Sequence, residues 1–542
     1  MKPADGISWD DRKRRTVTAV ATATAMVLAA GAFATSAHAA PRMISVIVRA
    51  QPGDAAAADQ LVTSLGGHVD QQIALINALV AEVPASATST LGASPDVAQV
   101  TSNAPVHLLG SSFGATGSGY SPVTDVNSMY NIEAMDGAHT YWDAGYTGQG
   151  VGVALIDSGV TPVNGLDTQG KVVYGPDFSP ESRNSSLHNL DTFGHGTHMA
   201  GIIGGLDDNV TSVSSSDSTD FMGMAPNAQI VSIKVANAVG QTNVARVLSA
   251  INWVVQHQSS LNIGVLNLSY GSNTDDPYVL DPLAYAAEQA WLSGIVVVVA
   301  AGNDGNYSDG LEDPAIDPYV IAVGATDTES TTNVAAHQPA SFTSEGSGTR
   351  NPDLAAPGTH IVSLRDPGSF IDDAFGATAD VGSRFFLGSG SSQAAAIVSG
   401  AAALLLSQRP SLTPDQVKAL LVGNTSAIHG TPRLTGSGEL NLATALTVPA
   451  PSAVQTWPVS NGGRSDRRFS PDGASWSGTS WSGASWSGAS WSGASWSGAS
   501  WSGTSWSGAW WSGASWSGAS WSGASWSGAS WSGSSWSDSG WS

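Results

Sequence analysis

The sequence of 542 residues contains no cysteine, which excludes disulfide bonds, a cysteine nucleophile and a zinc site built on thiolates. Positive charge is also scarce: 20 lysines and arginines stand against 43 aspartates and glutamates, so the formal net charge is −23. Nucleic acids and anionic membranes are polyanions and repel such a surface. We therefore expect no nucleic-acid partner and interpret the acidity as an aid to solubility outside the cell.

Long apolar runs are rare too, and the one near the N-terminus is only weakly apolar. Basic residues at 12–15 precede an Ala/Thr/Val-rich run at 16–35, and Ala37-His38-Ala39 follows. This order is typical of a signal peptide cleaved after Ala39. We expect residues 1–39 to be removed and the protein to be secreted, with no membrane association after cleavage. An uncleaved anchor is the alternative, but the run is barely long enough to span a bilayer.

The remaining chain divides by composition into four parts. Residues 40–120 hold β-prone and helical segments that predict a small ferredoxin-like α+β domain, followed by a Gly/Ser-rich linker at 110–120. Residues 449–472 read as a second linker. Residues 473–542 repeat W-S-G-A-S with a period of five.

Residues 121–448 alternate apolar strands with helices and predict an α/β domain with a mainly parallel sheet. The apolar runs lack alternation, which indicates strands buried on both faces by helices. A capping box with proline at the first helical position predicts a helix start at Thr413. The expected strands are 151–156, 230–235, 264–268 and 295–300, and the expected helices are 244–258 and 283–292.

The tryptophans of the C-terminal repeat would line up only in a coil that turns once per five residues, or per multiple of five. Three interpretations remain open from the sequence. The repeat is a flexible low-complexity tail, a row of aromatic rings that stacks on cell-wall polysaccharide, or a self-association segment.

Three separate segments carry the groups needed for catalysis by a serine hydroxyl. Asp157 ends the strand 151–156, His195 lies in G-H-G-T-H, and Ser392 lies in G-S-G-S-S-Q-A-A-A at the start of a helix. A hydroxyl needs a base to remove its proton, and the base needs an anion to orient it. Asn303, in A-A-G-N-D-G, could donate a hydrogen bond to an oxyanion.

Each of these motifs alone also has an ordinary structural interpretation. An aspartate before glycine is often a turn former, and a serine before a helix is often its N-cap. The two histidines of G-H-G-T-H could bind a metal, but no third ligand lies nearby, so we predict no metal site there.

Together, in the order Asp, His, Ser, the motifs resemble those of the subtilisin family over about residues 121–448. The resemblance implies a subtilisin-like three-layer sandwich and a serine endopeptidase that cleaves polypeptides. It also implies that Asp157 orients the base, His195 is the general base, Ser392 is the nucleophile and Asn303 is an oxyanion donor.

The resemblance extends to two segments that would bind an extended substrate and wall the pocket for the residue before the scissile bond. They are Ser269, Tyr270 and Gly271, and Ala300, Ala301 and Gly302. The chain departs from the family around the nucleophile. Ser391 stands where the family has Thr, and Gln393, Ala395, Ala396 and Ile397 replace Met, Ser, Pro and His. No catalytic atom is lost by these changes.

Residues from about 41 to 106 resemble the family's inhibitory propeptide, which implies self-cleavage within 109–122 and a propeptide that inhibits its own enzyme. We expect catalysis to need no cofactor. Structural calcium would suit three acidic pairs, because it takes hard oxygen ligands. These pairs are Asp207–Asp208, Asp275–Asp276 and Asp372–Asp373.

A competing hypothesis places the chain in a different class. The departures after Ser392 and the tryptophan repeat would also suit a wall-binding or adhesive surface protein. Its protease domain would then be degenerate, or would serve only its own processing.

Overall fold

The computed structural model describes residues 41–108, 120–272, 277–306, 308 and 310–457, and the backbone of short strands between 475 and 541. The predicted signal peptide, nearly all of the 110–120 linker, the Asp275–Asp276 pair and residues 458–472 of the second linker lie outside the described residues. In the described part, no helix has both the length and the apolar character needed to cross a membrane.

Residues 43–102 form a βαββαβ unit, the element order of the expected ferredoxin-like domain. Its antiparallel sheet has the order β2-β3-β1-β4. β2 was not predicted, because its segment HVDQQI is polar and only Ile73 is fully buried at this sheet edge. The elements are β1 (Met43–Ala50), α1 (Ala55–Ser64), β2 (His68–Ile73), η2 (Ala74–Ile76), β3 (Ala78–Pro84), η3 (Ala85–Ala87), α2 (Thr88–Ala93) and β4 (Val97–Ser102).

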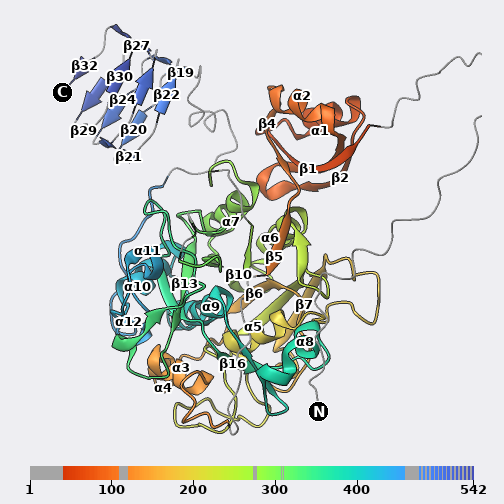
Figure 1. Cartoon of the computed structure of the whole chain (residues 1–542), viewed down its shortest axis with the longest axis vertical. Coiled ribbons are helices and arrows are strands. Elements are labelled where there is room, and N and C mark those ends of the chain that lie inside the picture. The colour runs from red at the N-terminus through yellow and green to blue at the C-terminus, as the bar shows by residue number, and fades with distance from the viewer. Residues whose placement is uncertain are drawn as a thin grey trace, which may run out of the picture. The chain divides into compact units, whose positions relative to one another are not determined.

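A mainly parallel sheet forms the centre of the region beyond residue 120 (Figure 1). Its order is β14-β13-β12-β10-β6-β8-β7, with β15 also paired to β13, and only β14 runs antiparallel to its neighbour. The predicted α/β class is therefore confirmed. The strands are β6 (Gly152–Asp157), β7 (Val172–Asp177), β8 (Gln229–Lys234), β10 (Ile263–Leu268), β12 (Val296–Ala300), β13 (Ile321–Asp327), β14 (Gln338–Pro339) and β15 (Leu354–Pro357).

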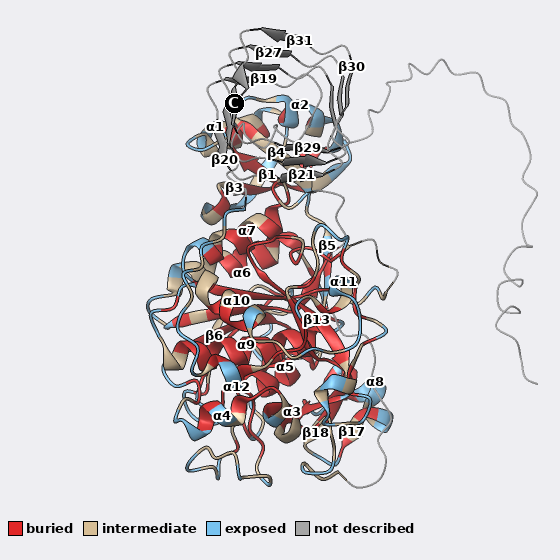
Figure 2. Ribbon diagram, turned by 90° about the vertical axis from the view of Figure 1, so that its left-hand side faces the viewer, coloured by how far each residue is buried: buried red, intermediate tan, exposed pale blue. Residues whose placement is uncertain are grey.

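Helices cover the sheet in two groups, and the strands and the helices against them are mostly buried (Figure 2). Helices α5 and α9 pack on each other, and α9 also packs on β10, β12 and β13, whereas α6 and α7 form a second pair against β6 and β12. The helices are α3 (Met129–Met135), α4 (Ala138–Asp143), α5 (His195–Gly204), α6 (Val244–His257), α7 (Pro282–Leu292), η4 (Val334–Ala336), α8 (Phe370–Ala379), α9 (Ser391–Gln408), α10 (Pro414–Gly423), α11 (Pro432–Thr435) and α12 (Leu442–Ala445).

Helix α9 is apolar or small on all sides, and its residues 391–406 are all buried, as expected for a helix in the middle of a core. Helix α10 begins with the expected capping box. The Thr413 side chain accepts from the backbone N–H of Gln416, and the Gln416 side chain accepts from the N–H of Thr413.

Two small sheets flank the central one. The first has the order β11-β5-β9 and consists of β5 (Pro105–Leu108), β9 (Gln241–Asn243) and β11 (Tyr270–Gly271). The second consists of β16 (Ile361–Leu364), β17 (Asp380–Val381) and β18 (Phe385–Gly388).

Residues 451–457, the start of the second predicted linker, are hydrogen-bonded to the α/β domain. The backbone N–H of Gln455 donates to Asp415 of α10 at 2.9 Å. The Tyr319 hydroxyl donates to the carbonyl of Trp457 at 2.7 Å. The chain therefore leaves the domain at a defined position.

The backbone of the repeat forms short strands that begin every five residues, from β19 (Ser475–Ser477) to β31 (Ser535–Ser537), followed by β32 (Gly540–Trp541). Strands β19 to β28 each pair in parallel with the strand 20 residues further on, as in the pairing of Trp476 with Trp496. One turn of this coil thus takes 20 residues, a multiple of five.

Candidate active site

Three of the residues singled out in the sequence lie at the same edge of the central sheet. Asp157 is the last residue of β6, Ser269 directly follows β10, and Asn303 follows β12. The strands β12, β10 and β6 are neighbours and run parallel, so their carboxyl ends meet. This edge is where open α/β sheets commonly bind ligands.

Asp157 and His195 form a buried pair. Nδ1 of His195 lies 2.9 Å and 3.0 Å from the two carboxylate oxygens of Asp157. Asp157 Oδ1 also accepts from the backbone N–H of Ser158 at 2.7 Å, which fixes the plane of the carboxylate. The geometry orients the imidazole so that Nε2 faces away from Asp157, and Nε2 has no hydrogen-bond partner among the described residues.

The charge of Asp157 makes His195 a stronger base than an ordinary histidine. Burial by itself lowers the pKa of His195, but the charge and hydrogen bond of Asp157 outweigh burial and leave that pKa above its ordinary value. A histidine poised in this way can take and return a proton near neutral pH.

Glycine at 196 permits the close approach of α5 to the end of β6. A Cβ atom at Gly196 would collide with the backbone oxygen of Gly159 and lie 3.1 Å from Asp157 Oδ1. The G-H-G motif thus brings the first turn of α5 directly against the orienting carboxylate.

Ser392 is the second residue of α9, where backbone N–H groups and the positive end of the helix dipole are available. The preceding Ser391 donates both its backbone N–H and its hydroxyl to Oδ1 of Asn303, at 2.9 Å and 3.0 Å. Because Oδ1 of Asn303 accepts both of these bonds, the NH₂ group of its amide is the end that can donate to an oxyanion. The structure therefore joins Asn303 to the start of α9, as it joins His195 to Asp157.

The departures from the family motif leave α9 regular. The helix runs without interruption from Ser391 to Gln408, and Gln393, in place of the usual methionine, is buried at 3% exposure. Ser391, in place of threonine, supplies the hydroxyl that bonds Asn303.

Asp191 fixes the approach to α5 and was not identified from the sequence. Its carboxylate accepts from the backbone N–H groups of Gly194 and Thr197, at 2.6 Å and 2.7 Å, and from the Thr197 hydroxyl. Burial raises the pKa of Asp191. An acidic residue just ahead of a helix start is a common capping signal, and it could have indicated this role.

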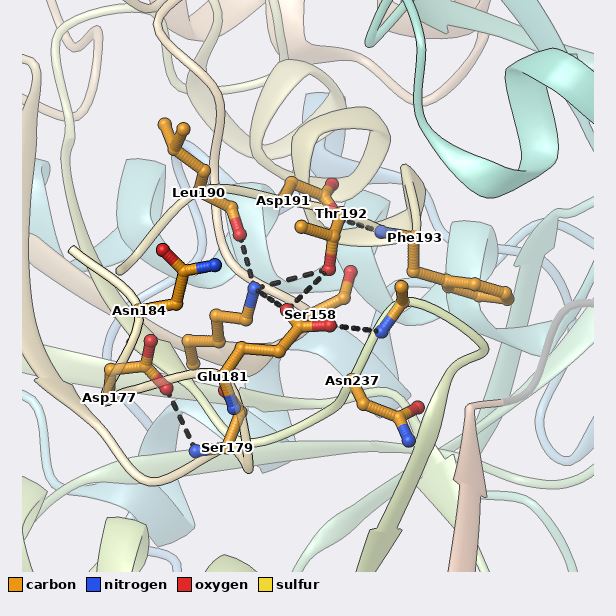
Figure 3. Close-up of polar contacts among 12 residues, drawn as sticks. Ser158, Asp177, Ser179, Glu181, Asn184, Leu190, Asp191, Thr192, Phe193 and Asn237 are labelled. Atoms are coloured by element: carbon orange, nitrogen blue, oxygen red, sulfur yellow. Dashed lines mark hydrogen bonds and ion pairs between the residues drawn. The ribbon is translucent and has the colours of Figure 1, made fainter. Parts of the chain in front are cut away.

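Lys234 holds the segment that leads to Asp191. Figure 3 shows the three residues to which it is bonded, Glu181, Leu190 and Thr192. Its fully buried ammonium donates to Glu181 at 2.7 Å, to the carbonyl of Leu190 and to the Thr192 hydroxyl. Lys234 ends β8 directly opposite Asp157 in the sheet register, so the same strand pair supports both the carboxylate and the segment before His195. A lone lysine at the end of a strand carries no sequence signal for this role.

The two predicted substrate segments lie beside this site, and one of them is already paired. Tyr270 and Gly271 of β11 are opposite Leu108 and His107 of β5, in antiparallel register. β5 also pairs with β9, so it is the middle strand of the small sheet. Ala300 is the last residue of β12, Ala301 and Gly302 follow it, and the N–H of Gly302 donates to the Ser391 hydroxyl oxygen.

In each of the two predicted calcium pairs that the structure describes, one aspartate has a cationic partner. Asp207 pairs with Arg384, and Asp372 pairs with Arg365. Across the described part of the chain, no group of three or more His, Asp or Glu side chains is arranged to hold a metal ion. The Asp275–Asp276 pair lies outside the described residues.

Comparison with known proteins gives consistent results. The model of the subtilase family matches residues 148–438. Serine protease AprX of Bacillus subtilis is 38% identical over 304 residues, which span 54% of this chain and 66% of that protein, just under two thirds. Subtilisin E of Bacillus subtilis is 30% identical over 388 residues, covering 71% of this chain and 84% of that protein.

A solved structure is also similar. Fervidolysin from Fervidobacterium pennivorans matches with a TM-score of 0.59 and 22% identity, covering 76% of this chain and 62% of that one. At this identity the match supports the fold, and it agrees with the subtilisin-like α/β architecture.

Proposed function

Because the chain belongs to the subtilase family, we propose that it is a secreted serine endopeptidase that hydrolyses peptide bonds through an acyl-enzyme. The observation that carries this proposal is the buried Asp157–His195 pair at the sheet edge where Asn303 meets the start of α9. Secretion rests on the predicted signal peptide at 1–39 and on the family.

In the proposed reaction, Oγ of Ser392 attacks the carbonyl carbon of the substrate while Nε2 of His195 removes the hydroxyl proton. The tetrahedral oxyanion accepts hydrogen bonds from the amide of Asn303 and the backbone N–H of Ser392. His195 then protonates the leaving amine, and the acyl-enzyme forms. A water molecule, deprotonated by His195, releases the acid in the same way, and Asp157 holds one tautomer of the imidazole throughout.

A fluorophosphonate probe tests this proposal on the processed protein, since it reacts with activated serines. We expect labelling at Ser392, with a rate that rises with pH through a pKa above the ordinary histidine value of about 6.5, because His195 must be neutral to act as a base. The measurement is labelling rate against pH, with casein digestion in parallel. Absence of labelling and digestion at every pH would favour the adhesive surface protein instead.

Residues 42–108 act in this proposal as an inhibitory propeptide. β5 lies between β9 and β11 and fills the edge where an extended substrate would pair. Val106 of β5 is fully buried. The remainder of the unit bonds to α6: the N–H of Leu75 donates to Asn252, and the N–H of Ala245 donates to Asn103.

We expect self-cleavage just beyond Leu108, within the first three residues of the segment 109–119. A strand that binds at this edge passes along β11 toward Asn303 and α9, so the bond after β5 reaches the reacting groups first. Mass spectrometry of the protein from culture medium should find a new N-terminus there. An N-terminus before Pro105, or a chain that retains residues 42–108 while active, would contradict the proposed role of β5.

A further inference from the structure

Glu312 lies between the two segments predicted to wall the pocket for the residue before the scissile bond. It is 7% exposed. One of its carboxylate oxygens, Oε1, accepts from the backbone N–H of Asn303 at 3.0 Å, and the N–H of Glu312 donates to the carbonyl of Ala301 at 3.1 Å. Its segment continues to Asp313, which pairs with Ser272 beyond β11. Glu312 thus belongs to the chain that closes the space between β11 and the end of β12.

Glycines on both walls make room for this carboxylate. A Cβ at Gly271 would collide with Glu312 Oε2 and lie 2.6 Å from its Cδ. A Cβ at Gly302 would lie 2.7 Å from Oε1. Any larger residue at either glycine would displace the glutamate, so the two wall segments are shaped around its side chain.

The charge of Glu312 is not compensated by a cation. No cation is among the groups that act on the Glu312 carboxylate, and the nearby charge that does act on it is the negative one of Asp304. Burial raises the pKa of Glu312 to about 7, the N–H of Asn303 opposes that rise, and the charge of nearby Asp304 adds to it. Above that pH the space between β11 and the end of β12 contains a desolvated negative charge, which a bound cation would stabilise.

We propose that Glu312 selects lysine or arginine as the residue before the scissile bond. This inference rests on the proposed function. The carbonyl of that residue must reach Asn303 and the N-terminus of α9, and Glu312 is bonded to the backbone of Asn303 itself. A peptide paired with β11 directs the side chain of this residue between Gly271 and Gly302, where a long cationic side chain reaches the carboxylate.

Self-processing does not depend on this selection. Residues 105–120 contain no lysine or arginine. Cleavage beyond β5 would be intramolecular, and the high effective concentration of a tethered segment compensates for a missing side-chain contact. Substrates that arrive from solution have no such advantage.

The test compares two peptides that differ in one residue, which is lysine in one and methionine in the other, directly before the scissile bond. The two side chains have similar lengths, but only lysine is charged. At about pH 8.5, where the carboxylate is ionised, we expect the processed enzyme to favour lysine by about tenfold or more in kcat/KM. Glu312→Gln keeps the shape and the acceptor for Asn303, and it should reduce the ratio to about one or below. Glu329→Gln, the same change at an exposed position, should leave the ratio unaltered.

Several outcomes would overturn the assignment. One is a wild-type enzyme that favours methionine over lysine. Another is a lysine-to-methionine ratio of kcat/KM that is the same in the wild type and in Glu312→Gln. If Glu312→Ala increased cleavage after large apolar residues without changing the lysine-to-methionine ratio, Glu312 would act through size and not charge. Failure of the proposed function has a different signature, because neither peptide would be cleaved and the fluorophosphonate would not react.

Discussion

Replacement of Ser392 by alanine is expected to lower kcat for peptide hydrolysis on the order of 10⁶-fold, because no other hydroxyl can take its place at the start of α9. Ser391 is adjacent, but both its backbone N–H and its hydroxyl are bonded to Asn303. The same variant, expressed as the full chain, should keep residues 42–108 attached. Casein digestion, probe labelling and the mass of the secreted chain measure these effects.

Ser407→Ala provides a matched control, since it removes a hydroxyl from the far end of the same helix. It should retain activity, labelling and processing. The Ser392 variant should unfold at nearly the wild-type temperature, because it loses one hydroxyl and leaves the helix intact. A Ser392→Ala chain that matures and digests casein normally would refute the assignment of the nucleophile.

The Asp157→Asn substitution should lower kcat by about 10⁴-fold with little change in KM. The N–H of Ser158 would hold the amide oxygen of the new side chain at the Oδ1 position. The amide nitrogen would then occupy the Oδ2 position, 3.0 Å from Nδ1 of His195, and donate to it. When Nδ1 accepts this bond, the proton lies on Nε2, and that tautomer of His195 cannot deprotonate Ser392.

The pH profile separates this effect from simple misfolding. Asp157 raises the pKa of His195, so the variant's residual activity should depend on a histidine of lower pKa, and its acidic limb should shift to lower pH. Asp167→Asn, which makes the same charge change at an exposed position, should keep the wild-type rate and profile. An Asp157→Asn enzyme within tenfold of wild type would mean that Asp157 does not orient the base.

The sequence alone predicted the parts of the site that lie within short motifs. Asp157 at a strand end, the glycines around His195 and the small residues before α9 are local patterns, because each depends on close backbone approach or on a helix start. The same holds for the buried strands and the capping box of α10, whose signals come from apolar runs and from residues three apart.

Features formed by segments far apart in the sequence produce no local motif and could not be predicted. Glu312 and Lys234 are ordinary charged residues until the fold brings them beside the two wall segments and beside Glu181. The pairing of β5 with β9 and β11 joins residues more than a hundred positions apart, and its short strands show no alternation. Register between such segments follows from the whole core and cannot be deduced from either strand.

The contacts of residues 451–457 determine where a force applied to the C-terminal part of the chain would act on the α/β domain. Any pull applied to the chain beyond Trp457 reaches the domain first at Tyr319 and Asp415. Asp415 also accepts from the indole N–H of Trp291 in α7, so the force would spread into α7 and α10. If the repeat anchors the protein to a surface, tension would pass through this corner, while Asp157 and His195 lie on other elements, β6 and α5.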